Sequence, residues 1–177
     1  MDMVTHNHER AKQQSGMPPL RVQASLYLQQ VPSLEDLRRR FNPRQAELIP
    51  AHVTLCREDE VDDWRELKAR ALGLDPLQLK LTFGRPVREQ NLVYLPVVEG
   101  LDAFRMLRET LLGASPRDHD PHITLIHPRN GNCTDDVFDE IMRLSRPFSH
   151  TFEVIRVIEQ RNGGVWRTVF RSDSAGN

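Results

Sequence analysis

The 177-residue chain has only two cysteines and no long apolar run, and each scarcity excludes a class of protein. Two cysteines cannot build a disulfide framework, so we expect Cys56 and Cys133 to be reduced thiols. No apolar stretch of the sequence approaches membrane-spanning length, and the polar residues 1–16 lack the apolar segment of a secretory signal. The sequence therefore predicts a cytoplasmic protein that has no membrane partner.

Excess positive charge is also absent, because the formal net charge is −1. This value excludes a generic nucleic-acid binder that is coated in positive charge. Aromatic residues make up only 6% of the chain, so few side chains can stack on a base; the candidates are Phe83, Tyr94, Phe148 and Trp166. Lysine is rare as well, since 21 of the 24 basic residues are arginines, which bind phosphate in a bidentate way. A GC-rich genome would give the same bias, so composition does not decide the function.

The length fits one domain or two tightly joined half-domains. We expect residues 1–19 to form a disordered tail, residues 20–170 a single bilobal domain, and residues 171–177 a second tail. The patterning predicts strands at residues 20–30, 51–57, 77–87, 92–99, 122–126, 148–159 and 165–170. It predicts helices at residues 33–42, 62–72, 101–112 and 134–144, with Ser33 and Thr134 as N-caps of the first and last. The order of elements in the first half returns in the second, which predicts an α+β fold of two halves, each a mainly antiparallel sheet with outer helices.

A tetrapeptide that occurs twice is the most informative feature of the chain. His-Val-Thr-Leu at His52–Leu55 returns as His-Ile-Thr-Leu at His122–Leu125, 122 − 52 = 70 residues later. Val, Ile and Thr favour strands, in which alternate side chains point to opposite faces. The His and Thr of each copy therefore share one face, while the two apolar residues face a core. Two imidazoles and two hydroxyls that face a common space can bind a phosphate and move protons around it.

This duplicated motif resembles the hallmark of the two-histidine (2H) phosphoesterase superfamily, which includes bacterial 2′-5′ RNA ligase-like proteins and 2′,3′-cyclic nucleotide phosphodiesterases. The resemblance extends over Leu20 to about Phe170. It implies two pseudo-symmetric lobes around a central cleft. It also implies a metal-independent phosphodiesterase that opens 2′,3′-cyclic phosphate ends of RNA or nucleotides, or reversibly joins a 2′-5′ RNA linkage. The implied partner is an RNA end or a small nucleotide with a cyclic phosphate; no cofactor and no protein partner is indicated, and we expect a monomer.

Four residues are candidates for the chemistry of ring opening. The attacking water must lose a proton and the leaving ribose oxygen must gain one, and an imidazole with a pKa of about 6.5 can do either near neutral pH. In-line attack puts base and acid on opposite sides of phosphorus, so His52 and His122 are the candidate catalytic residues. Thr54 and Thr124 are candidate phosphate-binding residues, whose hydroxyls would donate to the non-bridging oxygens. The sequence leaves the two histidine roles open; we favour His122 as base and His52 as acid.

Three further residues, Arg57, His127 and Arg129, are candidates for binding the rest of the substrate. Ligase-like relatives often have an arginine at the position of His127, whereas here Arg129 follows two residues later. Arg57 does occupy the equivalent position of the first motif. A regular strand would place His127 on the face opposite His122. Each of the three is equally well explained as a surface residue.

Two alternatives to this site remain open. Asp118, His119 and Asp120 precede His122, and these residue types also bind zinc or manganese, so a metal-dependent hydrolase is one alternative. The spacing matches no known metal signature, and a solvated loop explains residues 118–120 more simply. The other alternative is a non-catalytic module of the same fold that binds RNA or a nucleotide. The intact His and Thr of both motifs argue against it, because a pure binder needs no proton donors.

Overall fold

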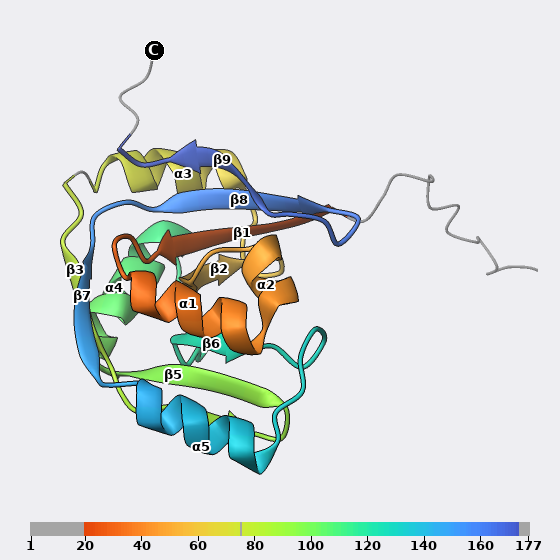
Figure 1. Ribbon diagram of the computed structural model, residues 1–177. Helices are drawn as coiled ribbons and strands as arrows, with labels where there is room; N and C mark the ends of the chain where they lie inside the picture. Colours follow the sequence, from red (N-terminus) through yellow and green to blue (C-terminus); the bar gives the residue numbers. More distant parts are fainter. Residues whose placement is uncertain (1–19, 75, 174–177) are drawn as a thin grey trace, which may run out of the picture.

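The computed structural model describes residues 20–74 and 76–173, in which two mainly antiparallel sheets are accompanied by helices (Figure 1). The first sheet has the strand order β2-β1-β8-β9. Its strands are β1 (Leu20–Tyr27), β2 (His52–Arg57), β8 (Arg156–Arg161) and β9 (Arg167–Arg171). The second sheet has the order β4-β5-β3-β7, with β6 paired to β5. Its strands are β3 (Leu79–Phe83), β4 (Val87–Glu89), β5 (Leu92–Glu99), β6 (His122–Ile126) and β7 (Phe148–Phe152).

The helices begin and end at residues with clear local roles. They are α1 (Pro32–Phe41), α2 (Pro43–Leu48), α3 (Trp64–Leu72), α4 (Leu101–Leu112) and α5 (Asp135–Leu144). Thr134 caps α5 as predicted, since its side chain accepts from the N–H of Val137, and α4 ends at Gly113 in a left-handed conformation with φ of 71°. The prediction for α1 was wrong in detail, because Pro32 occupies the first helical turn and Val31 is the N-cap, which leaves Ser33 inside the helix.

The α+β class with two lobes is confirmed, but the lobes do not divide the chain into a first and a second half. The predicted strand 148–159 is two strands, β7 and β8, and the chain crosses from the second sheet to the first between them (Figure 1). β8 then pairs along β1, from Leu20–Arg161 to Ser25–Arg156. The last hairpin, β8–β9, therefore completes the sheet that contains β2.

The apolar residues of the two motifs lie in the core, as the alternation predicts. Val53, Leu55 and Ile123 are fully buried, and Leu125 is 2% exposed. Cys56 is buried beside them, and burial raises the pKa of its thiol to about 12, so this cysteine is held in its unreactive form.

The domain expected at residues 20–170 is flanked by two expected tails that reach beyond the described residues. The expected tail 1–19 lies outside the described residues, as do residues 174–177 of the expected C-terminal tail. Arg171 ends β9, and Ser172 exchanges two hydrogen bonds with Ile155, through its N–H at 2.9 Å and its Oγ at 3.0 Å. Strand β9 and its contacts thus extend past residue 170.

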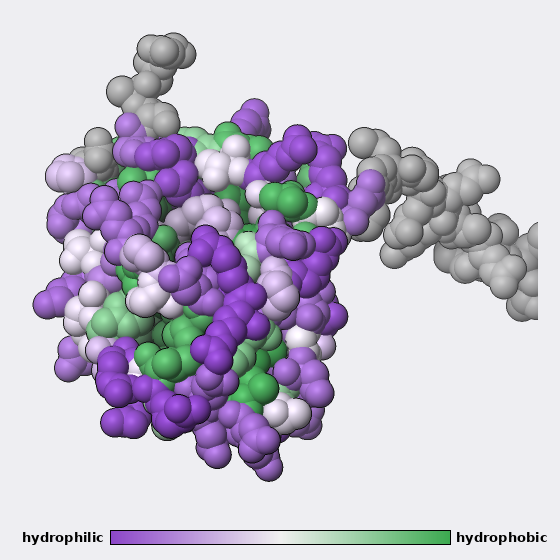
Figure 2. Space-filling view, viewed as in Figure 1, coloured by the Kyte–Doolittle hydropathy of each residue, from purple (hydrophilic) through white to green (hydrophobic). Residues whose placement is uncertain are grey.

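The surface that carries α1 and α5 has an apolar groove between these two helices (Figure 2). Arg40 of α1 and Glu140 of α5 form an ion pair between the two helices. The groove shares no lining residue with the cavity described below. Its apolar lining comprises Val31, Leu34, Leu37, Leu95, Leu144, Pro147 and Phe148. No helix among residues 20–74 and 76–173 combines the length and the apolar character that crossing a membrane requires.

Candidate active site

The two motif strands share one irregularity at one position. In β2 the pairing with β1 shifts register after Thr54, so that Leu55 has no partner in β1. In β6 the pairing with β5 shifts after Thr124, so that Leu125 has no partner in β5. An extra residue of this kind turns the side chains that follow it to the opposite face. After each motif leucine, the side chains of the strand therefore alternate out of step with those before it.

A cavity of about 420 Å³ lies where β2 and β6 approach one another. Its wall is completed by β1, α2, the loop after β6 and the β8–β9 hairpin. This volume is within the range of pockets that hold small ligands. All seven residues singled out from the sequence line it: His52, Thr54, Arg57, His122, Thr124, His127 and Arg129.

Both histidines are held by the same local contact. The Nδ1 of His52 lies 2.8 Å from the carbonyl oxygen of Pro50, and the Nδ1 of His122 lies 2.8 Å from that of Asp120. A carbonyl oxygen can only accept, so each Nδ1 carries the proton of this bond. Each ring therefore presents Nε2 for proton transfer, which is the arrangement that a pair of acid/base histidines needs.

Partial burial at the cavity wall dominates the protonation of His52. It is the main cause that lowers the pKa of His52 from 6.5 to about 4; the hydrogen bond to Pro50 opposes it, and the charges of Arg38 and His122 act in the same direction as burial. His52 is therefore neutral at neutral pH. With its Nδ1–H bonded, its Nε2 has a free lone pair that can accept a proton.

The two threonines lie beside the histidines on the cavity side of their strands. Both side chains are partly exposed, whereas Val53, Leu55, Ile123 and Leu125 next to them are buried. Among the described residues, neither threonine hydroxyl has a hydrogen-bond partner. The hydroxyls are thus free to donate to a ligand in the cavity.

Arg57 and His127 reach the cavity because of the two irregular leucines. The expectation that His127 faces away from His122 holds only for a regular strand, and the unpaired Leu125 makes it wrong here. Burial is the main cause that lowers the pKa of His127, and the charges of Arg129 and Arg21 add to it. Arg57 and Arg129 form no ion pair with a carboxylate among the described residues. Their guanidinium groups are available to an anion.

Sequence reasoning missed part of the opposite wall of this cavity. Trp166 and Arg21 line it, and the Arg21 guanidinium lies 5.4 Å from the centroid of the indole ring. The N–H of Trp166 donates to the Leu48 carbonyl at 2.9 Å, which ties the β8–β9 hairpin to the end of α2. Trp166 was one of four aromatic candidates, but no pattern in the sequence places its hairpin next to the first motif.

The comparison with protein families agrees with this geometry. The profile of the 2′-5′ RNA ligase superfamily matches residues 26–164, which include both His-x-Thr-Leu motifs. The chain belongs to this superfamily. The resemblance to the two-histidine phosphoesterases is thereby confirmed. A search of curated proteins found no match.

Several solved structures have a similar fold at low sequence identity. LigT of E. coli complexed with ATP is 16% identical, with a TM-score of 0.55, over 86% of this chain and 96% of that chain. LigT complexed with NADP+ is 17% identical over 86% and 96%, also with a TM-score of 0.55. A conserved protein of unknown function from Agrobacterium tumefaciens is 13% identical over 89% of this chain and 87% of that chain, with a TM-score of 0.55. At these identities the likeness concerns the fold.

A buried arginine links the two motif strands of this superfamily member. Arg38 of α1 is 1% exposed, and it donates to the carbonyl of Ile49, just before β2, at 2.8 Å. It also donates from Nε to the carbonyl of Thr124 in β6 at 3.2 Å, and from Nη1 to Glu35 at 2.9 Å. The sequence contained one signal: Arg38 falls four residues after buried Leu34, on the core-facing stripe of its helix.

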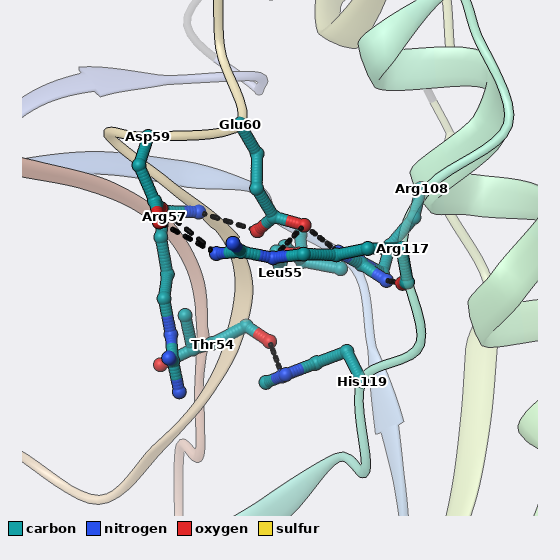
Figure 3. A network of polar contacts seen from close by, with 8 residues as sticks. All are labelled: Thr54, Leu55, Arg57, Asp59, Glu60, Arg108, Arg117 and His119. Carbon is teal, nitrogen blue, oxygen red and sulfur yellow. Dashed lines mark hydrogen bonds and ion pairs between the residues drawn. The ribbon is translucent and has the colours of Figure 1, made fainter.

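A second buried arginine organises the other side of β2 (Figure 3). Arg108 of α4 is 2% exposed and donates to the carbonyl of Leu55 at 2.8 Å. It also forms an ion pair with Glu60. Glu60 forms a second ion pair with Arg117, whose Nε lies 3.2 Å from the carboxylate. Arg117 lies in the loop that leads to β6, so this cluster joins the segment after the first motif to the segment before the second.

The acidic segment before the second motif does not assemble as a metal site. Among the described residues no group of three His, Cys, Asp or Glu side chains is placed to hold a metal ion. Asp118 and Asp120 are exposed. His119 instead directs its Nε2 to the carbonyl of Thr54 at 3.1 Å (Figure 3).

Proposed function

We propose that the protein is a metal-independent phosphodiesterase that opens 2′,3′-cyclic phosphate ends of RNA or nucleotides by two-histidine acid/base catalysis. One observation carries the proposal: His52 and His122 come from different sheets, line one cavity and are held through Nδ1 in the same way. Thr54 and Thr124 supply free hydroxyls in that cavity. Membership of the 2′-5′ RNA ligase superfamily supports the same chemistry.

The proposed reaction needs only proton transfers around phosphorus. Water attacks phosphorus in line while one imidazole takes its proton, the bond from phosphorus to one ribose oxygen breaks, and the other imidazole protonates that oxygen. The products are a ribose phosphomonoester and the adjacent free hydroxyl. The two threonine hydroxyls would stabilise the charge on the non-bridging oxygens. If a ribose 5′-hydroxyl replaces water, the same steps form a 2′-5′ linkage.

We base the roles of the two histidines on the state of His52 before substrate arrives. Its low pKa keeps it neutral with Nε2 unprotonated, so we assign it as the base of ring opening and His122 as the acid. This is the reverse of the assignment favoured from the sequence, which had no information on burial.

The proposal is tested with alanine variants of the two histidines. His52→Ala and His122→Ala should each lower the rate of hydrolysis of a nucleoside 2′,3′-cyclic phosphate by about 10²-fold or more. His150→Ala is the matched control, because His150 lies in β7 and does not line the cavity. EDTA should leave the rate unchanged. Wild-type-like activity in either folded variant, or a loss with EDTA that zinc or manganese restores, would contradict the mechanism.

A further inference from the structure

The two motif strands face each other along unpaired edges. β2 is the outermost strand of its sheet, and β6 pairs only with β5 among the described strands. The two strands contact one another across the boundary between the sheets. The free edge of a strand presents N–H and carbonyl groups without ladder partners. Because β2 and β6 do not pair with one another as strands, a carbonyl at this junction needs a donor from elsewhere.

Each of the two lobes supplies one such donor to the other. The carbonyl of Thr124 in β6 accepts from Arg38, which lies in α1 between β1 and β2. The carbonyl of Thr54 in β2 accepts from His119, which lies just before β6 (Figure 3). The exchange is reciprocal, and it falls on the same residue of both motifs.

We propose that Arg38 and His119 are positioning residues of the two-histidine site. Each holds the motif strand of the opposite lobe through the main-chain carbonyl of its threonine, and together they fix the distance between the two imidazoles. The inference deepens the proposed function. Its predicted effect on catalysis rests on that function, whereas its predicted effect on phosphate binding does not.

The surroundings of Arg38 support a positioning role. Its guanidinium is buried and pairs with Glu35, whose other carboxylate oxygen accepts the N–H of Ala51 at 2.5 Å. Ala51 directly precedes His52, so Glu35 holds the chain just before this histidine. Arg38 holds Thr124, the threonine of the second motif. A buried guanidinium whose three nitrogens each form a hydrogen bond is a rigid spacer, since moving it would leave a charge and several polar groups without partners.

The surroundings of His119 exclude the simpler role of a third proton carrier. Its ring stacks on Phe104 with centroids 6.0 Å apart and an interplanar angle of 28°. Burial is the main cause that lowers its pKa to about 4, so it is neutral at neutral pH and has a single N–H. That N–H is used by the Thr54 carbonyl. His119 therefore holds β2 and has no proton to give.

A matched pair of variants tests His119. His119→Gln keeps an N–H donor near the position of Nε2, whereas His119→Phe keeps the flat ring and removes the donor. Binding of inorganic phosphate is followed through the NMR ring resonances of His52 and His122, and melting temperature, kcat and KM are measured in parallel. We expect His119→Phe to bind phosphate about tenfold more weakly and to lose about 10²-fold in kcat, as for a reacting group displaced by an ångström. His119→Gln should stay within about threefold of the wild type on both measures.

Arg38→Lys and Arg38→Met give a second and independent test. Both lose the bond to Thr124, but the lysine variant keeps the charge. Both should lower kcat, while only Arg38→Met should raise the pKa of His52, which the same NMR titration reports. If the Arg38 variants do not fold, the His119 pair decides.

The outcomes separate this proposal from the proposed function. A His119→Phe protein with a lower melting temperature but unchanged phosphate affinity and kcat would overturn the positioning role and leave the function intact. If the wild type binds phosphate at both histidines but hydrolyses no cyclic phosphate, the proposed function fails. The phosphate series then still decides whether Arg38 and His119 hold the two imidazoles in register.

Discussion

At the scale of the residue, the candidate site depends on where the protons of two imidazoles lie. Both rings donate from Nδ1 to a carbonyl two residues earlier, although they belong to different sheets. His52 is the more informative of the two, because its burial keeps it neutral. Its assignment as base makes a specific prediction for the dependence of the rate on pH.

The value of kcat/KM should remain high as the pH falls from 7 to about 5 and should decline as it approaches 4, where His52 becomes protonated and can no longer accept a proton. Cyclic-nucleotide hydrolysis measured from pH 3.5 to 9 locates this acidic limb of the profile. A rate that already declines near pH 6.5 would contradict a neutral His52 as the base.

The threonine hydroxyls make a prediction that is independent of protonation. Thr54→Val and Thr124→Val keep the shape of the side chain but remove a donor to the phosphate. Each should lower kcat by roughly 10–10³-fold, at or below the effect of one oxyanion donor. Thr110→Val in α4, whose hydroxyl bonds only within its own helix, is the control. Full activity in both single variants would show that the hydroxyls do not touch the phosphate.

Trp166 makes a prediction about the base of the substrate. If a base stacks on the indole that Arg21 contacts, Trp166→Ala should cost about 1–3 kcal/mol of binding, or roughly 5–150-fold in KM. Ribose 2′,3′-cyclic phosphate, which has no base, is the control substrate, and its KM should not change. An equal loss on both substrates would indicate a general defect of the cavity.

At the scale of the element, the sequence predicted the helices and strands that local residue patterns determine. The helix at residues 101–112 and the strand at residues 122–126 were predicted with the boundaries that the structure has. The six-residue helix α2 was missed, and it is too short for a periodic pattern to develop. The shifts of register at Leu55 and Leu125 were missed because an unpaired residue is defined by the partner strand, which the sequence of one strand does not contain. The shared cavity of the two His/Thr pairs could be predicted from the motifs, whereas the way in which Arg57 and His127 reach that cavity could not.

The buried cluster behind β2 makes a prediction at this scale. The Glu60 side chain is 7% exposed and pairs with Arg108, whereas the Asp59 side chain is 59% exposed and pairs with Arg117. Glu60→Gln leaves the buried Arg108 without a counter-charge and should lower the free energy of unfolding by about 3–5 kcal/mol. Asp59→Asn, the control, should change the free energy of unfolding far less, because an exposed ion pair contributes little to stability. Urea denaturation of both variants measures the difference, and similar losses would contradict this account of the cluster.

At the scale of the whole molecule, the sequence predicted two lobes but not which strands belong to each. Residues 148–159 have continuous strand character, so nothing local marks the crossing between the sheets at residues 153–155. The pairing of β1 with β8 joins segments more than a hundred residues apart, and only the complete fold determines it. Arg38 and His119 were likewise hidden, because each acts on the opposite lobe.

Two half-buried histidines at the junction of the lobes make a prediction for the stability of the whole fold. Burial is the main cause that lowers the pKa of His52 and of His119 to about 4, whereas both titrate near 6.5 in an unfolded chain. Between pH 6.5 and 4 the unfolded state therefore binds more protons, so stability is present above this window and is lost as the pH falls through it.

The melting temperature should thus fall between pH 7 and pH 4.5, and His119→Gln should show a smaller fall than the wild type because it removes one of the two groups. Thermal unfolding of both proteins at pH 7, 6, 5 and 4.5 provides the measurement. Equal falls in the two proteins would mean that His119 does not contribute to the acid sensitivity.

The return of β8 and β9 to the first sheet has a consequence for how the protein is made. A ribosome releases β1 and β2 early, but the strand that covers the other edge of β1 begins only at Arg156. Until then, β1 exposes an edge to which another chain can pair, and such edges lead to aggregation. A chain that stops before Arg156 would contain both histidines and both threonines of the site and would still lack half of the sheet that supports His52. A premature stop so late in the message should therefore yield an insoluble product, even though every candidate catalytic residue has been synthesised.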